Sequence, residues 1–435
     1  MSHQGPAGNW AVTNGAKVSG FDGGDAGYGA DLRDEALRGH GKDRLFTSNF
    51  VLATLANFVN AFSVQMLVAT LPVYVVTQGG SNADAGLVTG ALALTALLFR
   101  PLMGWLADNW RRRPLILIGT SFYGLASVVY LLAGSIPLLI FGRLVQGFGL
   151  GCYTTAANAY VADIAPIGRR AEAVGFFAAA LDAGLIVGPV AGFMLVGTMG
   201  FHCLFYFTGA LSVVALSVSL LTRERKRPRE TARRRWSPRT DIVSADALPA
   251  AWMALCMGIG FGAINAFISI FAQSHGIGNP GFFFMIQAVA LLISRTFAGR
   301  VADVYGRAVA IVPGILLMAA ALAMLPLAHS LPHFVISAVL LGIGFGSAQP
   351  ASMALLIDRV RPEKRGLAMS TYFTGIDMGF IIGTIPMGVV SLHWGFGVMW
   401  PVSAACTLLA LAGIGAARRP AGGTTNGTRG KDEPE

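Results

Sequence analysis

Between Arg44 and Asp84 the chain carries no charged side chain, and long apolar runs recur to its end. A helix crosses the hydrocarbon core of a bilayer with about 20 apolar residues, because each residue adds about 1.5 Å. Only 12% of the residues are charged, about half the share of a soluble domain, and the mean hydropathy is +0.61. The sequence therefore predicts an all-α, polytopic membrane protein.

The apolar runs predict twelve transmembrane helices, at 47–76, 83–107, 114–134, 136–162, 171–196, 200–222, 248–274, 281–303, 308–328, 331–357, 366–390 and 395–417. Residues 1–44 are rich in Gly, Asp and Ala and lack the apolar core of a signal peptide, so we expect a disordered cytoplasmic tail. The remaining chain divides into a first bundle (45–222), a basic linker (223–247), a second bundle (248–417) and a cytoplasmic tail (418–435).

The chain also matches itself. A shift of 195 residues carries Arg100 onto Arg295 and Asp182 onto Asp377. Without a gap, the same shift aligns Gly104 with Gly299, Asp108 with Asp303, Arg112 with Arg307, Asp163 with Asp358, Arg170 with Arg365, Gly184 with Gly379 and Gly188 with Gly383. We interpret this register as a tandem duplication, in which two six-helix bundles are related by a parallel repeat.

Lys and Arg residues lie in alternate turns between the predicted helices. One set of turns contains Arg111 to Arg113, Arg169 and Arg170, the linker and Arg307, whereas the opposite set contains no Lys or Arg. Basic turns stay on the cytoplasmic side, so both termini are expected to be cytoplasmic and the protein to reside in the cytoplasmic membrane. This topology accounts for the net charge of +10 without a nucleic-acid partner.

Two motifs combine small residues with charge or with proline. The first reads Gly104-x-Leu106-Ala107-Asp108-x-x-x-Arg112-Arg113 and returns as Gly299-x-x-x-Asp303-x-x-Gly306-Arg307. Small residues let membrane helices approach closely, and Asp108 at its helix end can bond to Arg112 or Arg113. The second motif places Gly184, Gly188, Pro189 and Gly192 along one helix, with the glycines on one face.

These motifs resemble those of the major facilitator superfamily, whose halves are parallel repeats. Arg143-x-x-Gln146-Gly147-x-Gly149 looks like the motif of proton-coupled members, and Gly184-x-x-x-Gly188-Pro189-x-x-Gly192 resembles that of the drug and metabolite antiporters. The first motif departs from the family pattern at Asn109 and Arg111. The resemblance implies a cytoplasmic latch between Asp108 and the start of the eleventh helix. It also implies a sealing face between the halves at Gly184 to Gly192, for which ordinary helix packing is the alternative.

Charges inside the membrane are costly and therefore candidates for function. Arg143, Asp182 and Asp377 lie within predicted spans, and the two aspartates are expected near the midplane, facing each other. A carboxylate removed from water can bind and release a proton, so we predict that Asp182, Asp377 or both carry a coupling proton. Arg143 would tune one of them or bind an anionic group of the substrate. Alternatively, each Asp bonds a neighbouring polar group and only orients its helix.

Neutral polar and aromatic side chains are the candidates for a substrate pocket, although each can also simply bridge two helices: Asn57, Asn60, Gln65, Asn265, Gln287, Tyr372 and Phe373. The leading hypothesis is a monomeric secondary transporter that exports a small organic molecule in exchange for protons. The alternatives are an importer of a sugar or organic acid, and a membrane sensor without transport. The sequence contains no metal-ligand spacing, cofactor motif or nucleophile constellation, so no enzyme activity, cofactor or metal is expected.

Overall fold

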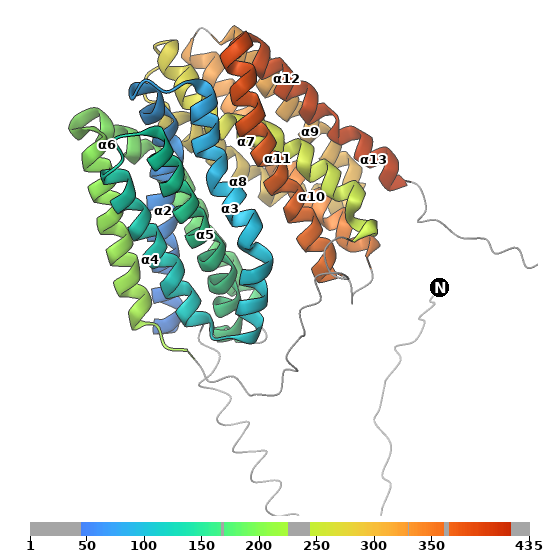
Figure 1. Cartoon of the computed structure of the whole chain (residues 1–435). Helices are drawn as coiled ribbons and strands as arrows, with labels where there is room; N and C mark the ends of the chain where they lie inside the picture. Colours follow the sequence, from blue (N-terminus) through green and yellow to red (C-terminus); the bar gives the residue numbers. More distant parts are fainter. Residues whose placement is uncertain (1–44, 167–168, 225–243, 329, 361–364, 419–435) are drawn as a thin grey trace, which may run out of the picture. The chain divides into compact units, whose positions relative to one another are not determined.

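The computed structural model describes residues 45–166, 169–224, 244–328, 330–360 and 365–418, and every regular element in these ranges is a helix (Figure 1). The elements are α2 (Ser48–Thr77), α3 (Asn82–Asn109), α4 (Arg112–Leu131), α5 (Ile136–Ile164), α6 (Arg170–Leu221), η2 (Ala245–Ala247), α7 (Leu248–Ser274), α8 (Gly281–Tyr305), α9 (Arg307–Met324), η3 (Leu325–Leu327), α10 (Leu331–Arg359), α11 (Arg365–Trp394), α12 (Phe396–Leu408) and α13 (Ala410–Arg418). The predicted N-terminal tail (1–44), most of the linker and most of the C-terminal tail lie outside the described residues.

Eleven helical segments of the described chain are long and apolar enough to cross a membrane. The difference from the twelve predicted spans lies in α6, a helix of 52 residues with a non-helical residue, Gly200, inside it. Gly200 adopts φ 81° and ψ 175°, a backbone conformation that favours glycine because it has no Cβ. The sequence predicts a turn between two spans at this position, and the number of twelve spans remains a prediction.

A second glycine explains why the two copies of the charged motif differ in sequence. Gly306 has φ 94° at the start of α9, whereas Arg111 at the corresponding place before α4 has φ −74°. Glycine is therefore needed only in the second copy, where the backbone enters the left-handed region.

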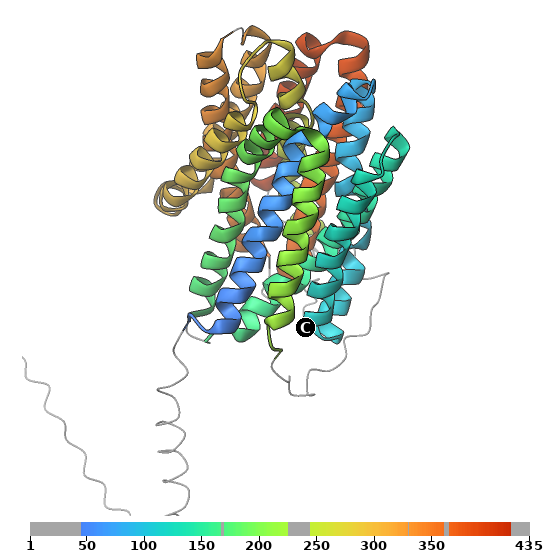
Figure 2. The same cartoon turned by 90° about the vertical axis from the view of Figure 1, so that its left-hand side faces the viewer.

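The helices of the N-terminal half (α2 to α6) and the C-terminal half (α7 to α13) pack in corresponding ways. In Figure 2, α2 (blue) lies between the two parts of α6 (green), and α11 packs along α7 as α6 packs along α2. The halves meet mainly where α3 packs along α11 and where α6 packs along α8. The described residues from Phe46 onwards thus form one compact unit. The division into two six-helix bundles and the internal repeat remain predictions.

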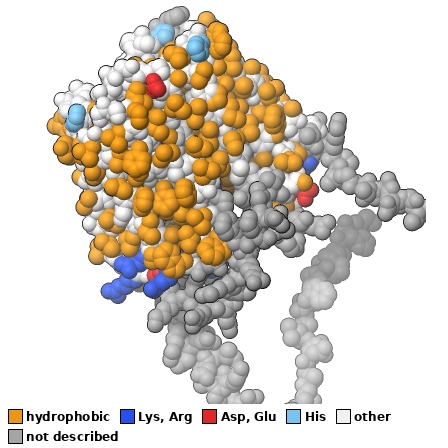
Figure 3. Space-filling view, viewed as in Figure 1, with side chains coloured by type: hydrophobic (Ala, Val, Ile, Leu, Met, Phe, Trp, Pro, Cys, Tyr) orange, Lys and Arg blue, Asp and Glu red, His pale blue; other side chains and the backbone are white. Residues whose placement is uncertain are grey.

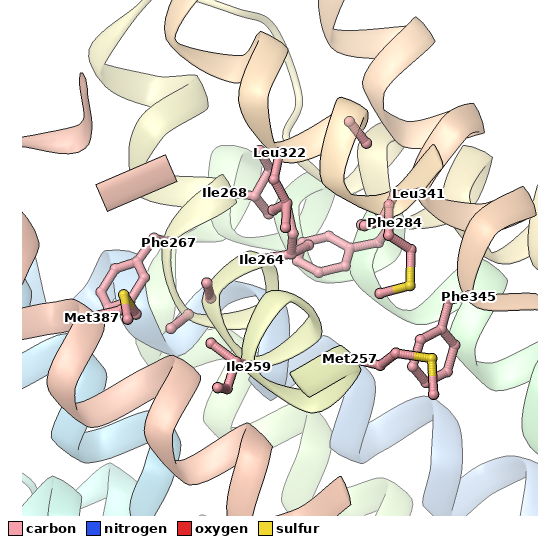
Figure 4. Close-up of a cluster of buried hydrophobic side chains, with 14 of the residues drawn as sticks. Met257, Ile259, Ile264, Phe267, Ile268, Phe284, Leu322, Leu341, Phe345 and Met387 are labelled. Carbon is pink, nitrogen blue, oxygen red and sulfur yellow. The ribbon is translucent and has the colours of Figure 1, made fainter. Parts of the chain in front are cut away.

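The most deeply buried helix is α7. In its most apolar stretch, 89% of the residues are buried. Figure 4 shows Met257, Ile264 and Phe267 of α7 pointing towards side chains of the neighbouring helices. Those neighbours are Phe284 of α8, Leu322 of α9, Leu341 and Phe345 of α10 and Met387 of α11. This packing buries α7 away from lipid and leaves the outer helices to face it.

Apolar side chains cover most of the face in Figure 3, whereas Lys and Arg side chains gather at its lower end. With no water in the bilayer core, a segment that crosses it must satisfy its backbone groups internally, as a helix does. The apolar helices and this surface identify a multi-pass membrane protein. The cytoplasmic placement of both termini remains a prediction.

Candidate functional site

Two ion pairs join the halves inside the helical region. Asp377 of α11 lies 3.1 Å from Arg100 of α3, and Asp182 of α6 lies 3.7 Å from Arg295 of α8, each measured between a carboxylate oxygen and a guanidinium nitrogen. The two aspartate side chains are only 17% and 16% exposed. Both aspartates lie about 18 Å along their helices from the first residue, at 1.5 Å per residue. The two charged pairs at this depth connect α3 with α11 and α6 with α8.

The sequence predicts the two aspartates as candidates but misses both arginines. Arg100 and Arg295 lie inside predicted spans (83–107 and 281–303), yet no role was predicted for them, and the structure places them inside α3 and α8. Each aspartate has an arginine of the other half as its partner, and the expectation that the two aspartates face each other remains a prediction. The repeat carries the missed signal, since the shift that aligns Asp182 with Asp377 also aligns Arg100 with Arg295.

Arg143 is a buried charge with neutral partners. Its side chain is 1% exposed and donates to the Gln146 carboxamide oxygen and the Leu67 carbonyl oxygen, each at 3.0 Å. The Tyr130 hydroxyl donates to the same Gln146 oxygen at 2.9 Å. The described residues give Arg143 no carboxylate partner, so its predicted influence on Asp182 or Asp377 has no direct contact behind it.

The charged motif holds helix ends within each half. Arg112 forms an ion pair with Asp163 and donates to the Ala159 carbonyl oxygen, and Arg113 donates to the Leu220 carbonyl oxygen at 2.7 Å. In the second copy, Arg307 of α9 pairs with Asp303 of α8. It also pairs with Asp358 of α10 at 3.0 Å. The expected partner of Arg112 was Asp108, so its bond to Asp163 was not predicted.

Two expectations about the first motif change in the structure. Apart from its own helix, no atom of the described residues lies within 4 Å of the position that a Cβ on Gly104 would take, so the predicted close helix contact is not made among them. The Asp108 side chain and residues 361–364 lie outside the described part of the chain. The predicted latch at the start of α11 therefore remains untested.

The glycine face of α6 packs within its own half. A Cβ on Gly184 would lie 2.8 Å from Phe62 N, one on Gly188 2.9 Å from Gln65 Cβ, and one on Gly192 3.1 Å from Met66 O. These partners all belong to α2, so the glycines do not form the predicted sealing face between the halves. The contact between the halves uses the adjacent positions, where Gly281 of α8 would place a Cβ 2.6 Å from Val190 Cα.

Three predicted pocket residues line one cavity between the halves. The amide cavity, as we call it, lies between α2, α6, α7 and α8, has a volume of about 20 Å³, and is lined by Gln65, Asn265 and Gln287 together with Pro189, Phe261 and Phe284. The other candidates lie elsewhere. Asn57 donates to Phe177 O at 2.8 Å, Asn60 lies 3.5 Å from the Thr120 hydroxyl, and Tyr372 is hydrogen bonded to Ser352, with Phe373 packed against its ring.

Asn57, Asn60 and Tyr372 thus connect helices, as the alternative interpretation of these residues proposed. The arrangement that remains combines an enclosed amide-lined cavity with one charged pair, Asp182 with Arg295, on two of the helices that line it. Two helical halves that meet at such a cavity are the arrangement of a membrane transporter fold.

Comparisons with known proteins agree with this class. The family model described as Major Facilitator Superfamily matches residues 53–293 and 280–433. The chain therefore belongs to the major facilitator superfamily, and it is a multi-pass membrane transporter of that family.

Similar proteins come from archaea and bacteria. The chain is 22% identical over 370 residues to the uncharacterized MFS-type transporter MJ1560 of Methanocaldococcus jannaschii, covering 82% of this chain and 94% of that protein. It is 23% identical over 347 residues to the quinolone resistance protein NorA of Staphylococcus aureus, covering 77% and 87%. The crystal structure of the nucleoside transporter NupG has a TM-score of 0.70 at 15% identity, covering 86% and 100%. This last similarity concerns the fold alone.

Proposed function

We propose that the protein exports a small organic molecule from the cell in exchange for protons, by alternating access between its halves. It would act as a monomer in the cytoplasmic membrane, with twelve spans and both termini on the cytoplasmic side. The observation that carries the proposal is the pair of ion pairs that join Asp182 to Arg295 and Asp377 to Arg100 across the halves.

In this mechanism the aspartates bind the coupling protons. An arginine keeps its charge at every physiological pH, so only the aspartate of each pair can change its charge. Protonation of Asp182 or Asp377 would remove the attraction to the arginine of the other half. The halves would then separate at this level, and loss of the proton would restore the pairs. Proton binding is coupled in this way to the relative position of the halves.

Helices α3 and α11, which carry Arg100 and Asp377, also contact each other at their other ends. These contacts would close the opposite side of the protein. Asn82 of α3 donates to the Ser391 hydroxyl of α11 at 2.8 Å, and a Cβ on Gly388 would lie 2.9 Å from the Asn82 carbonyl oxygen. The contact of Asn82 with Ser391 and the ion pair of Arg100 with Asp377 therefore lie at different levels of the same two helices. A rocking motion of the halves can therefore exchange one set of contacts for the other.

Export is supported by the α6 motif and by the similarity to NorA, whose name describes quinolone resistance. A test uses purified protein in proteoliposomes with an acidic lumen, with a dye that reports internal pH. A quinolone, a nucleoside or isoquinolone is added outside, and proton release is recorded. We expect solute-dependent release by the wild type and its loss in the Asp182→Asn/Asp377→Asn double variant.

The control variant is Asp246→Asn, because Asp246 is an exposed carboxylate in η2, outside the long helices. It should release protons like the wild type. Equal release by the folded double variant would contradict the role of both aspartates. Proton uptake into the lumen along an imposed inward solute gradient would instead identify a symporter, as expected of an importer.

A further inference from the structure

The amide cavity contains hydrogen-bonding groups that the protein itself does not use. Gln287 is 4% exposed, and within the described chain its side chain makes no hydrogen bond, nor does that of Gln65. Asn265 donates through its side-chain nitrogen to Phe261 O at 2.8 Å, which leaves its carboxamide oxygen as an acceptor. The polar atoms of these amides are therefore open to hydrogen bonds from a ligand that enters the cavity.

No charged side chain lines this cavity. The nearest charges follow one helical turn away, since Asp182 lies three residues before Leu185 and Arg295 four residues after Leu291, and both leucines line the cavity. These two charges neutralise each other at 3.7 Å. An ion in the cavity would lack a counter-charge, and burying an unpaired ion is far more costly than burying a hydrogen-bonded amide.

Aromatic side chains complete the walls. Phe261 is held against Phe345 with ring centroids 4.6 Å apart and an interplanar angle of 19°, and Phe284 lies on the α8 side of the cavity. A carboxamide offers a donor and an acceptor side by side, which matches the adjacent N–H and C=O of a cyclic amide. Flat apolar walls with a few polar groups are typical of sites for ring-shaped organic ligands.

We propose that the transported substrate is an uncharged, flat ring compound with a cyclic amide edge, bound by Gln65, Asn265 and Gln287. This inference names the substrate class and rests on the proposed transport function. The present volume of about 20 Å³ holds about one water molecule. Because the walls come from both halves, their separation enlarges the cavity, and the halves close on it again after release.

The test compares ring compounds of one shape that differ in charge. Purified full-length protein in lipid nanodiscs is titrated with isoquinolone, which is a neutral cyclic amide, with cationic N-methylisoquinolinium and with anionic isoquinoline carboxylate. Binding is measured by calorimetry without a proton gradient. We expect isoquinolone to bind and both ions to bind at least roughly tenfold more weakly, a difference of about 1.4 kcal/mol.

Two variants locate the site. Gln287→Leu removes the amide at similar size and should weaken isoquinolone binding roughly tenfold, since it leaves the ligand without a partner. The control is Asn158→Leu, because Asn158 is an exposed amide of α5 that donates to Thr154 O and lies away from the cavity. Its binding should equal that of the wild type, and equal melting temperatures would show that both variants fold.

Several results would overturn the substrate class. Tighter binding of the cation, abolished by Asp182→Asn, would show that a cation displaces Arg295 and that the site is acidic. Tighter binding of the anion would assign the site to Arg295. No binding of isoquinolone, or binding unaffected by Gln287→Leu, would also refute it. Because calorimetry needs no proton movement, these results are independent of the proteoliposome experiment, so failure of either proposal can be recognised separately.

Discussion

Arg295 of α8 lies 3.7 Å from Asp182 of α6, and the second pair, Arg100 with Asp377, is the same pair with the halves exchanged. Each half supplies one arginine and one aspartate, and each residue finds its partner in the other half. The pairs have nearly equal exposure, with aspartates at 16% and 17% and arginines at 39% and 37%. Each pair therefore serves as a matched control for the other.

Removal of one partner should cost more stability than removal of both. Arg295→Gln leaves the Asp182 carboxylate without its partner, and we expect a loss of stability below the roughly 3–5 kcal/mol of a fully buried pair, since Arg295 is partly exposed. Asp182→Asn/Arg295→Gln should recover most of this loss. Thermal unfolding in detergent measures both variants. Additive losses in the double variant would show that the two side chains do not interact.

A methyl group at Gly86 should disturb the contact between the halves. The Cβ of Gly86→Ala would overlap the Thr384 carbonyl oxygen of α11, so α3 and α11 must move apart. In a background without native cysteines, Asn82→Cys and Ser391→Cys replace side chains that hydrogen bond at 2.8 Å, and we expect them to form a disulfide. Gly86→Ala should reduce the yield of this disulfide several-fold.

The control for this experiment is Gly197→Ala. Gly197 lies in α6, and no atom lies within 4 Å of its missing Cβ. The disulfide yield of this variant should match that of the parent. A similar decrease in both variants would point to a general effect of alanine on helix stability and not to the contact between the halves.

The fold was largely predictable because long apolar runs, bounded by glycine or charged residues, indicate membrane helices directly. The pairing of helices was not, since Asp182 and Arg295 lie far apart in sequence and nothing local links them. Arg100 and Arg295 fall inside predicted spans, and nothing in the local sequence indicates that they are the partners of the aspartates. Repeat symmetry was the one sequence signal that relates both arginines to both aspartates.

The pocket was predicted in part for a related reason. Asn57, Asn60 and Gln65 all lie on α2, and α2 has buried residues on most of its faces. Its sequence pattern does not indicate which face meets the other half. Only the packing of α6 and α7 around α2 separates Gln65, which lines the cavity, from Asn57 and Asn60, which bond to their neighbours within the N-terminal half.

Corresponding arginines of the two motif copies should differ in their importance for stability. Arg112 is 7% exposed and bonds to Ala159 and Asp163, so Arg112→Gln removes the hydrogen bond and ion pair of a buried guanidinium at a cost of roughly 1–3 kcal/mol. Arg307 is 26% exposed and its partner Asp358 is 52% exposed, so Arg307→Gln should cost about 0–1 kcal/mol. Melting temperatures of the two variants provide the comparison, and equal losses would contradict it.

Replacement of Arg143 by methionine separates stability from transport. Arg143 is a buried charge without a carboxylate partner in the described chain, and the Gln146 oxygen to which it donates still accepts from Tyr130 when Arg143 is removed. Arg143→Met therefore leaves no buried donor unpaired and removes a costly charge, so the melting temperature should stay equal or rise. A charge kept at such a cost is expected to act in transport, and solute-driven proton release should be lost.

Gln146→Leu has the opposite expectation for stability, because the buried Tyr130 hydroxyl loses its acceptor at a cost of roughly 1–3 kcal/mol. A destabilised Arg143→Met variant that still releases protons would assign Arg143 a structural role.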